Sequence, residues 1–193
     1  MITTNNTISQ SMLDKLRQCK GVTLDSVLCT DTGNTAKMLS MQLVVLRFND
    51  FDVELWNEEQ PNIPGELTDL AKIRIHTNAC KDVKSPIGKR DENGVFIPLD
   101  FIPIKIKKTI DGIIIHNEKI KCFNANGTEQ FELDNTRAIV ISFGDSFLHI
   151  EKQSSWSEIW DISIKETEVP EKSSEWENEE DSSYEVHSYS QSL

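Results

Sequence analysis

The sequence predicts a mainly β protein in which two similar antiparallel β units form a sandwich or a barrel. Stretches with alternating apolar residues recur between residues 22 and 164, and turn residues separate them. One stretch near the N-terminus has helical spacing instead. After Lys165 the composition becomes acidic and poor in apolar residues. We therefore expect a β-rich globular body over residues 1–165 and a disordered acidic C-terminal tail over residues 166–193.

The first predicted element is a short N-terminal helix. Its apolar positions Ile8, Leu13 and Leu16 share one helical face, and Gly21 is a stop signal. The residues after Gly21 alternate in the manner of strands, and the residues from Asp31 to Asn34 predict a turn. The strands predicted for the first half span residues 22–29, 37–48, 52–56 and 67–77.

The second half of the body follows a polar stretch, residues 78–94, which is predicted to be a loop between the halves. Pro98 and Pro103 cannot donate to a central ladder, so the strand near them is expected at a sheet edge. Asp111-Gly112 is a strong turn signal and predicts a hairpin over residues 103–117. Further strands are predicted over residues 119–123, 128–133, 137–143, 146–151 and 156–164, the last of which also fits a helical turn at its start.

Two stretches of the body, VVLRFNDFDVELW and IVISFGDSFLHIE, match each other at a distance of 95 residues. The match aligns Phe48 with Phe143 and Asp50 with Asp145. Turn formation explains the aspartates, and anchoring of a hairpin in the core explains the phenylalanines. We favour an internal duplication over about 21–80 and 95–165, while two hairpins built by the same rules remain the alternative.

The net charge of the chain is −12, with 20 basic and 32 acidic residues. From Glu166 onward nine acidic residues accompany a single basic one, so the tail contains most of the excess. This balance argues against a nucleic-acid partner and favours a protein partner with a basic surface. The sequence has neither a signal-peptide pattern nor an apolar run long enough to span a bilayer. We expect a cytoplasmic protein without membrane contact, of unknown oligomeric state.

Local motifs for catalysis are absent from the sequence. The four cysteines and four histidines lack zinc-ligand spacing, and the eight glycines form no phosphate-binding loop. Asp50 and Asp145 could form a pair of catalytic carboxylates, but their turn context explains them better. We therefore expect a protein that is not an enzyme and needs no cofactor or metal. The four cysteines are expected to be reduced thiols.

Tryptophans next to carboxylates are the strongest functional signal, because tryptophan supplies contact area at low entropic cost. Two clusters occur, one in each half, and they give the predicted protein interface: Trp56, Glu58, Glu59, Trp156, Glu158, Trp160 and Asp161. For Trp56 and Trp160 a place in the core is the competing interpretation.

The interface leads to one favoured function and three alternatives. The favoured function is an acidic immunity protein or inhibitor, of bacterial or phage type, that occludes a toxin or another protein partner. The alternatives are a phage-encoded inhibitor of a host defence protein, a structural or assembly subunit, and a β-barrel enzyme with a site built from distant residues.

Overall fold

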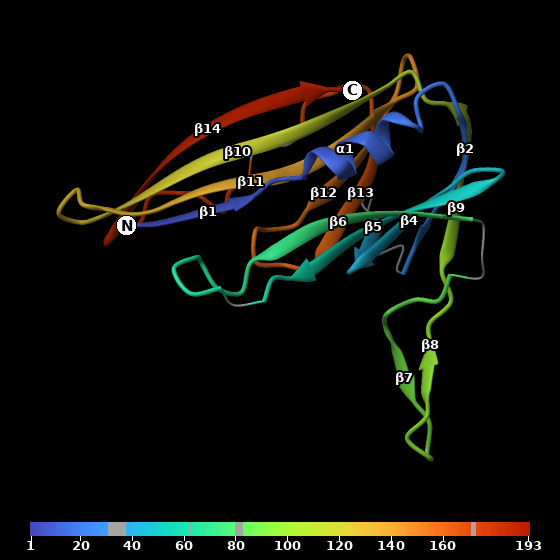
Figure 1. Cartoon of the computed structure of the whole chain (residues 1–193), viewed down its shortest axis with the longest axis horizontal. Helices are drawn as coiled ribbons and strands as arrows, with labels where there is room; N and C mark the ends of the chain where they lie inside the picture. The colour runs from blue at the N-terminus through green and yellow to red at the C-terminus, as the bar shows by residue number, and fades with distance from the viewer. Residues whose placement is uncertain (31–37, 62, 80–82, 171–172) are drawn as a thin grey trace.

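The computed structural model of the chain contains two mainly antiparallel β-sheets that pack face to face, and a small third sheet that projects from them (Figure 1). It describes all residues except 31–37, 62, 80–82 and 171–172. The two large sheets do not close into a barrel, because each has its own edge strands in the strand order. The predicted fold class is confirmed, and the architecture is the sandwich.

The first half of the chain supplies most strands of the five-stranded sheet, and the second half supplies most strands of the seven-stranded sheet. The five-stranded sheet has the order β6 (Ala71–Ala79), β5 (Phe51–Glu59), β4 (Leu43–Arg47), β2 (Thr23–Cys29) and β9 (Ile102–Thr109). The seven-stranded sheet has the order β14 (Ser182–Ser192), β10 (Gly112–Asn124), β11 (Glu129–Ser142), β12 (Phe147–Lys152), β13 (Ile159–Lys165) and β3 (Met38–Met41), and β1 (Ile2–Asn6) pairs parallel with β11. The third sheet contains β7 (Gly88–Arg90) and β8 (Phe96–Pro98).

Each large sheet contains one four-stranded antiparallel unit with the same strand order. The first unit is β2-β4-β5-β6, and the second is β10-β11-β12-β13. Their central hairpins also match in detail. The Phe48 N–H donates to the carbonyl of Phe51 at 3.0 Å, and the Phe143 N–H donates to that of Ser146 at 2.9 Å. Both phenylalanines are buried in the main core, so the two units are similar, as the aligned stretches indicate.

The main core lies between the two sheets and receives side chains from both. Its largest fully buried side chain is Trp160 of β13, whose indole N–H donates to the Gln42 carbonyl at 3.3 Å. The helix α1 (Gln10–Arg17) packs beside β6, where the Lys15 ammonium donates to the carbonyl of Ile75 at 2.6 Å. Leu13 and Leu16 of the helix complete the core on that side, which agrees with the predicted apolar face. No helix in the described parts of the chain is long and apolar enough to cross a bilayer.

The hairpin predicted at Asp111-Gly112 is wrong. The strands on either side of this turn belong to different sheets, since β9 pairs with β2 and β10 pairs with β11 and β14. Ile110 is fully buried at the crossing, and its backbone is held by Gly21 and Val22 through bonds of 2.8 and 3.0 Å. The turn signal is local, whereas burial of Ile110 between the sheets decides where the chain goes next.

The polar stretch before Pro98 is more than a loop. It contains β7, which pairs with β8 in a hairpin that extends away from the sandwich next to β9 (Figure 1). The edge position predicted near Pro98 and Pro103 is confirmed, since β9 is an edge strand of its sheet. The turn predicted from Asp31 to Asn34 lies outside the described residues.

The C-terminal tail differs most from its expected form. Residues 182–192 form β14, which pairs with β10 over its whole length along the edge of the seven-stranded sheet (Figure 1). Trp176 is only 8% exposed and packs with Ile120 and Leu133 in a second core. The prediction of disorder rested on mean composition. Mean composition gives too little weight to Trp176 and Tyr184, which pack with Ile120 of β10 and Leu133 of β11.

Candidate functional site

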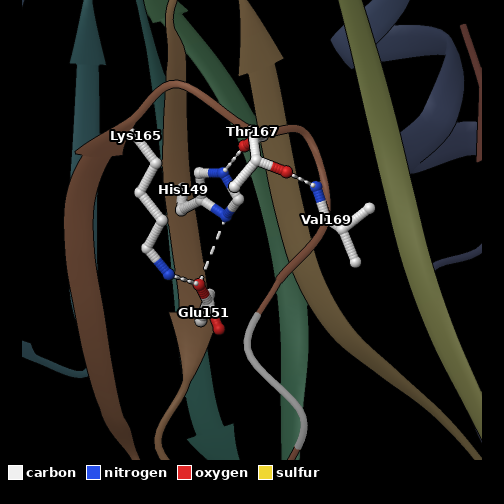
Figure 2. A network of polar contacts seen from close by, with 5 residues as sticks. All are labelled: His149, Glu151, Lys165, Thr167 and Val169. Carbon is white, nitrogen blue, oxygen red and sulfur yellow. Dashed lines mark hydrogen bonds and ion pairs between the residues drawn. The ribbon is translucent and has the colours of Figure 1, made fainter.

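The described residues between β13 and β14, 166–170 and 173–181, lie against the seven-stranded sheet and are called the strap below. Figure 2 shows where the start of the strap is fixed to the sheet. Nε2 of His149 lies 2.6 Å from the Thr167 carbonyl oxygen, and Nδ1 lies 3.2 Å from Glu151 Oε1. A carbonyl oxygen only accepts, so Nε2 bears the hydrogen. Lys165 pairs with the same Glu151 oxygen at 3.1 Å. The strap therefore begins at a buried polar network.

Glu151 keeps its charge in this network. Burial by itself would raise its pKa, but the interactions with His149 and Lys165 outweigh burial and lower it. The carboxylate is thus stabilised by two neighbours from β12 and β13. His149 is fully buried, and its contact with Thr167 ties the strap backbone to the sheet.

A second network connects the middle of the strap to both sheets. The Lys152 ammonium donates to the Ala71 carbonyl at 2.6 Å and to Asn135 Oδ1 at 3.0 Å. The Asn135 amide donates to Ser155 Oγ at 3.0 Å. The Ser155 N–H then donates to both carboxylate oxygens of Glu175, at 2.8 and 3.0 Å. An acidic strap residue thus completes a polar network that starts in the other sheet.

Burial shifts the titration of both charged ends of this network. Lys152 is only 1% exposed, and desolvation lowers its pKa to about 7, although Glu175 and Glu118 oppose the shift. Desolvation also raises the pKa of Glu175, against the hydrogen bonds from Ser155. Both groups therefore favour their neutral forms more than they would in water.

A pocket of about 580 Å³ is lined by the strap, β10, β14 and Arg137 of β11. Its apolar wall contains Val169, Pro170 and Val186, and its aromatic wall contains Trp176 and Tyr184. The indole of Trp176 lies 5.5 Å from the ring of Tyr184 and 5.2 Å from that of Trp156. We call this cavity the strap pocket.

The polar lining of the strap pocket contains groups without hydrogen-bond partners. They are His116 Nε2, Glu118 Oε2, the Nε and Nη1 of Arg137 and the indole nitrogen of Trp176. Arg137 lies at a β-bulge, because His116 pairs with Ala138 and Asn117 pairs with Thr136. Bulges redirect side chains and are common next to binding sites. Buried polar groups without partners are rare in folded proteins and call for an explanation.

The electrostatics of the strap pocket are mixed. Burial raises the pKa of Glu118, while Arg137 acts in the opposite direction with a smaller effect. The Trp176 indole is close enough to stabilise the Glu118 charge, although it makes no hydrogen bond of good geometry. Burial lowers the pKa of His116, and His149 adds to this effect. The pocket thus contains a permanent cation, Arg137, beside an acid that is costly to ionise.

Replacing Glu118 by glutamine is expected to stabilise the protein in a pH-dependent way. The raised pKa means that the folded state binds this proton more tightly than the unfolded state. Stability is therefore lost as pH rises from the ordinary value of 4.5 through the raised value. The melting temperature of Glu118→Gln relative to the original protein should increase over this range and then level off.

The control for this experiment is Glu132→Gln, measured by the same thermal melts between pH 4 and 8. Glu132 is paired with Lys119 at 2.9 Å on the surface of β11, and its pKa is lowered. Its replacement should leave stability unchanged or reduce it above pH 4.5. Equal pH profiles for the two variants would contradict the buried, destabilising ionisation of Glu118.

The predicted interface residues fall into two groups. The end of β5 meets the loop before β13, where Glu158 accepts hydrogen bonds from the Glu59 N–H at 3.0 Å and from Gln42 at 2.7 Å. Trp156 is 42% exposed and contacts Trp176 of the strap. The structure therefore brings Glu59 and Glu158 together, which sequence reasoning had placed in separate clusters.

The other predicted interface residues lie in different environments in the structure. Trp160 is fully buried, so it cannot touch a partner, and the core interpretation holds for it. Trp56 is half-buried on the outer face of the five-stranded sheet and donates to Glu54 at 2.9 Å. Glu58 pairs with Arg74 at 3.3 Å, and Asp161 lies half-buried on β13.

Three consecutive exposed apolar side chains lie in the projecting hairpin, residues 84–101, which we call the arm. Val95, Phe96 and Ile97 are 59%, 45% and 53% exposed. At its base Phe101 packs against Leu28 and neighbouring residues on the outer face of the five-stranded sheet. The backbone of the arm extends away from the body that supports it (Figure 1), and its apolar side chains are exposed.

Sequence reasoning missed the strap pocket because its lining comes from four separate segments, which are β10, β11, the strap and β14. His116 and Arg137 look like ordinary strand residues, and the bulge that brings them together leaves no local signature. Within the described residues no group of three or more histidine, cysteine or acidic side chains is arranged to hold a metal ion. Cys19 and Cys122 are buried free thiols, and burial raises the pKa of Cys19 to about 12.

Comparisons of this chain with protein-family models, with curated proteins and with solved structures found no match.

Proposed function

We propose that this protein is a non-catalytic protein-binding protein whose arm enters an apolar cleft of a protein partner and blocks it. The observation that carries the proposal is the exposure of Val95, Phe96 and Ile97 on a hairpin that extends from the sandwich. Contiguous exposed apolar side chains are uncommon on a monomer surface and are typical of interaction sites. Occlusion of this kind is how an immunity protein or an inhibitor acts.

The arm is held in shape before it meets a partner. Its turn is closed by the Asp91 N–H, which donates to the Val95 carbonyl at 3.0 Å, and by the Gly94 N–H, which donates to Asp91 at 3.0 Å. A Cβ atom at Gly88 would clash with the backbone of Ile97 and the ring of Phe96, so glycine is needed for this close pairing. A hairpin that is already ordered loses less conformational entropy on binding.

The arm and the rest of the chain differ in formal charge. The arm has three basic residues (Lys84, Lys89 and Arg90) and three acidic ones (Asp91, Glu92 and Asp100), so its formal charge is zero. The whole excess of −12 therefore belongs to the rest of the chain. A fitting partner has an apolar cleft surrounded by basic residues, because the acidic body would then speed association at low salt.

The double variant Phe96→Asp, Ile97→Asp tests this function. Charged side chains at the arm tip cannot be buried in an apolar cleft, so we expect a loss of at least about 100-fold in affinity, the scale of an interface hot spot. The partner is first captured from the native host with the original protein. Binding of the purified partner, and inhibition of its activity, are then measured for each variant.

Ile164→Asp is the matched control, because Ile164 is 54% exposed on β13 and lies outside the arm. It should bind the partner like the original protein. The proposal fails if the arm variant retains full affinity, or if no partner depends on the arm. Self-association that requires Phe96 and Ile97 would instead favour a structural or assembly subunit.

A further inference from the structure

The strap pocket contains an unusual set of buried groups, which the proposed binding through the arm does not use. Glu118 and Trp176 are each only 8% exposed, and both have a polar atom without a hydrogen-bond partner. Arg137 adds two further donor nitrogens without partners. An unmade hydrogen bond in the interior is costly, particularly for charged groups. A chain that keeps such groups around a cavity can recover this cost when a ligand supplies the missing partners.

The lining restricts the charge of that ligand. A simple cation would be attracted to Glu118 and Glu177 but would be repelled by Arg137. A simple anion would pair with Arg137 and the Trp176 indole but would meet the same two acidic side chains. A molecule with one carboxylate and one ammonium group complements both the acidic and the basic side chains of the lining.

The lining also restricts the shape of the ligand. The volume of about 580 Å³ is in the range of small-molecule sites and exceeds what a single ion requires. Val169, Pro170 and Val186 provide an apolar wall, and the Trp176 and Tyr184 rings provide an aromatic one. The polar end therefore adjoins a surface that suits an apolar side chain.

We propose that the strap pocket binds a small zwitterion of the α-amino-acid type that has an apolar side chain. Its carboxylate pairs with Arg137 and the Trp176 indole, its ammonium group pairs with Glu118, and its side chain contacts Val186 and the apolar wall. Arginine suits this task because its donors match the two oxygens of a carboxylate. The ligand would hold the middle of the strap against β10 and β14. This site is independent of the arm.

Isothermal titration of the full chain with L-phenylalanine and L-leucine tests the site. Each half of the zwitterion is tested separately with phenethylamine, which lacks the carboxylate, and 3-phenylpropionate, which lacks the ammonium group. Loss of a hydrogen bond to a charged group corresponds to about 10-fold or more in affinity. We expect binding of an amino acid, at least about 10-fold tighter than binding of either half-ligand. Binding of a half-ligand that equals that of phenylalanine, or no binding of either amino acid at millimolar concentration, would overturn the proposal.

Variants connect the binding to the named residues. Arg137→Gln and Glu118→Gln should each weaken amino-acid binding by about 10-fold or more, whereas Glu132→Gln on the surface of β11 should leave it unchanged. Val169 is 62% exposed at the pocket, so Val169→Trp can fill the cavity without disturbing the core. Val169→Trp should therefore also weaken amino-acid binding, and it provides the test if Arg137→Gln does not fold. The indole N–H resonance of Trp176 should shift on titration, and a shift confined to another tryptophan would place the ligand elsewhere.

Discussion

Replacing Trp176 by alanine is expected to lower the free energy of unfolding by about 3–5 kcal/mol, the usual cost of removing a buried aromatic side chain. Trp176 packs with Ile120, Leu133 and Leu70 and lies 6.5 Å from the ring of Phe131. Its loss would open a cavity between the strap and the sheet. In a disordered tail the same substitution would have almost no effect, so the experiment tests whether the tail is part of the fold. Urea unfolding followed by circular dichroism measures the change.

The control is Val169→Ala, in the same strap. Val169 is 62% exposed, so its shortening should change stability by no more than about 0.5 kcal/mol. Hydrogen exchange gives a second measurement, because amides of β14 that bond to β10 should be protected in the original protein and should exchange faster in Trp176→Ala. Equal stability of the two variants, together with fast exchange throughout β14, would contradict the pairing of β14 with β10.

Replacing Lys152 by methionine is expected to change the pH dependence of stability. The folded state lowers the pKa of Lys152 from 10.5 to about 7, because the ammonium group is almost completely removed from water. Between these values the unfolded chain binds a proton that the folded chain does not. Stability therefore rises with pH in this window by up to about 1.4 kcal/mol per pH unit for one group. Lys152→Met lacks this dependence.

The measurement is urea unfolding of both proteins at pH 7, 8 and 9. The difference between them should change by about 2 kcal/mol over these two pH units, with the original protein gaining stability relative to Lys152→Met. Other titrating groups are common to both proteins and cancel in the difference. Lys119→Met is the control, because Lys119 is an exposed partner of Glu132 and should show no such slope. Parallel pH profiles for Lys152→Met and the original protein would exclude the depressed pKa.

The strand pattern of the body could be predicted because strands are indicated by the local alternation of apolar and polar residues, and turns by the residues that favour them. Phe48 and Phe143 mark the two equivalent hairpin turns, and both are buried as their positions in the alternation indicate. The same local information placed the helix, where Leu13 and Leu16 face the core. Trp160 could not be assigned in advance, since its stretch fits both a helical turn and a strand.

The candidate sites depend on contacts between segments far apart in the chain. Lys152 donates to Ala71, which is 81 residues away, and the strap reaches Ser155 through Glu175, 20 residues later. Whether an acidic residue is solvated or buried is decided by what covers it, and composition averages over that difference. The sequence predicts a polar loop for the first part of the arm, up to Gly94, because charged residues such as Lys89 and Arg90 dominate it, and an edge strand for the part after it. The projection of the arm depends instead on where β9 enters the sheet.

The sequence by itself determined the fold class, the two similar antiparallel units and the position of the helix, because alternation and turn chemistry act over a few residues. Only the tertiary structure decided that the chain crosses between sheets at Ile110, that the acidic tail becomes a strap and the edge strand β14, and that Glu118, Arg137 and Trp176 surround one pocket. Each of these outcomes is set by long-range pairing and by the free energy of burying polar groups, which no short stretch of sequence specifies.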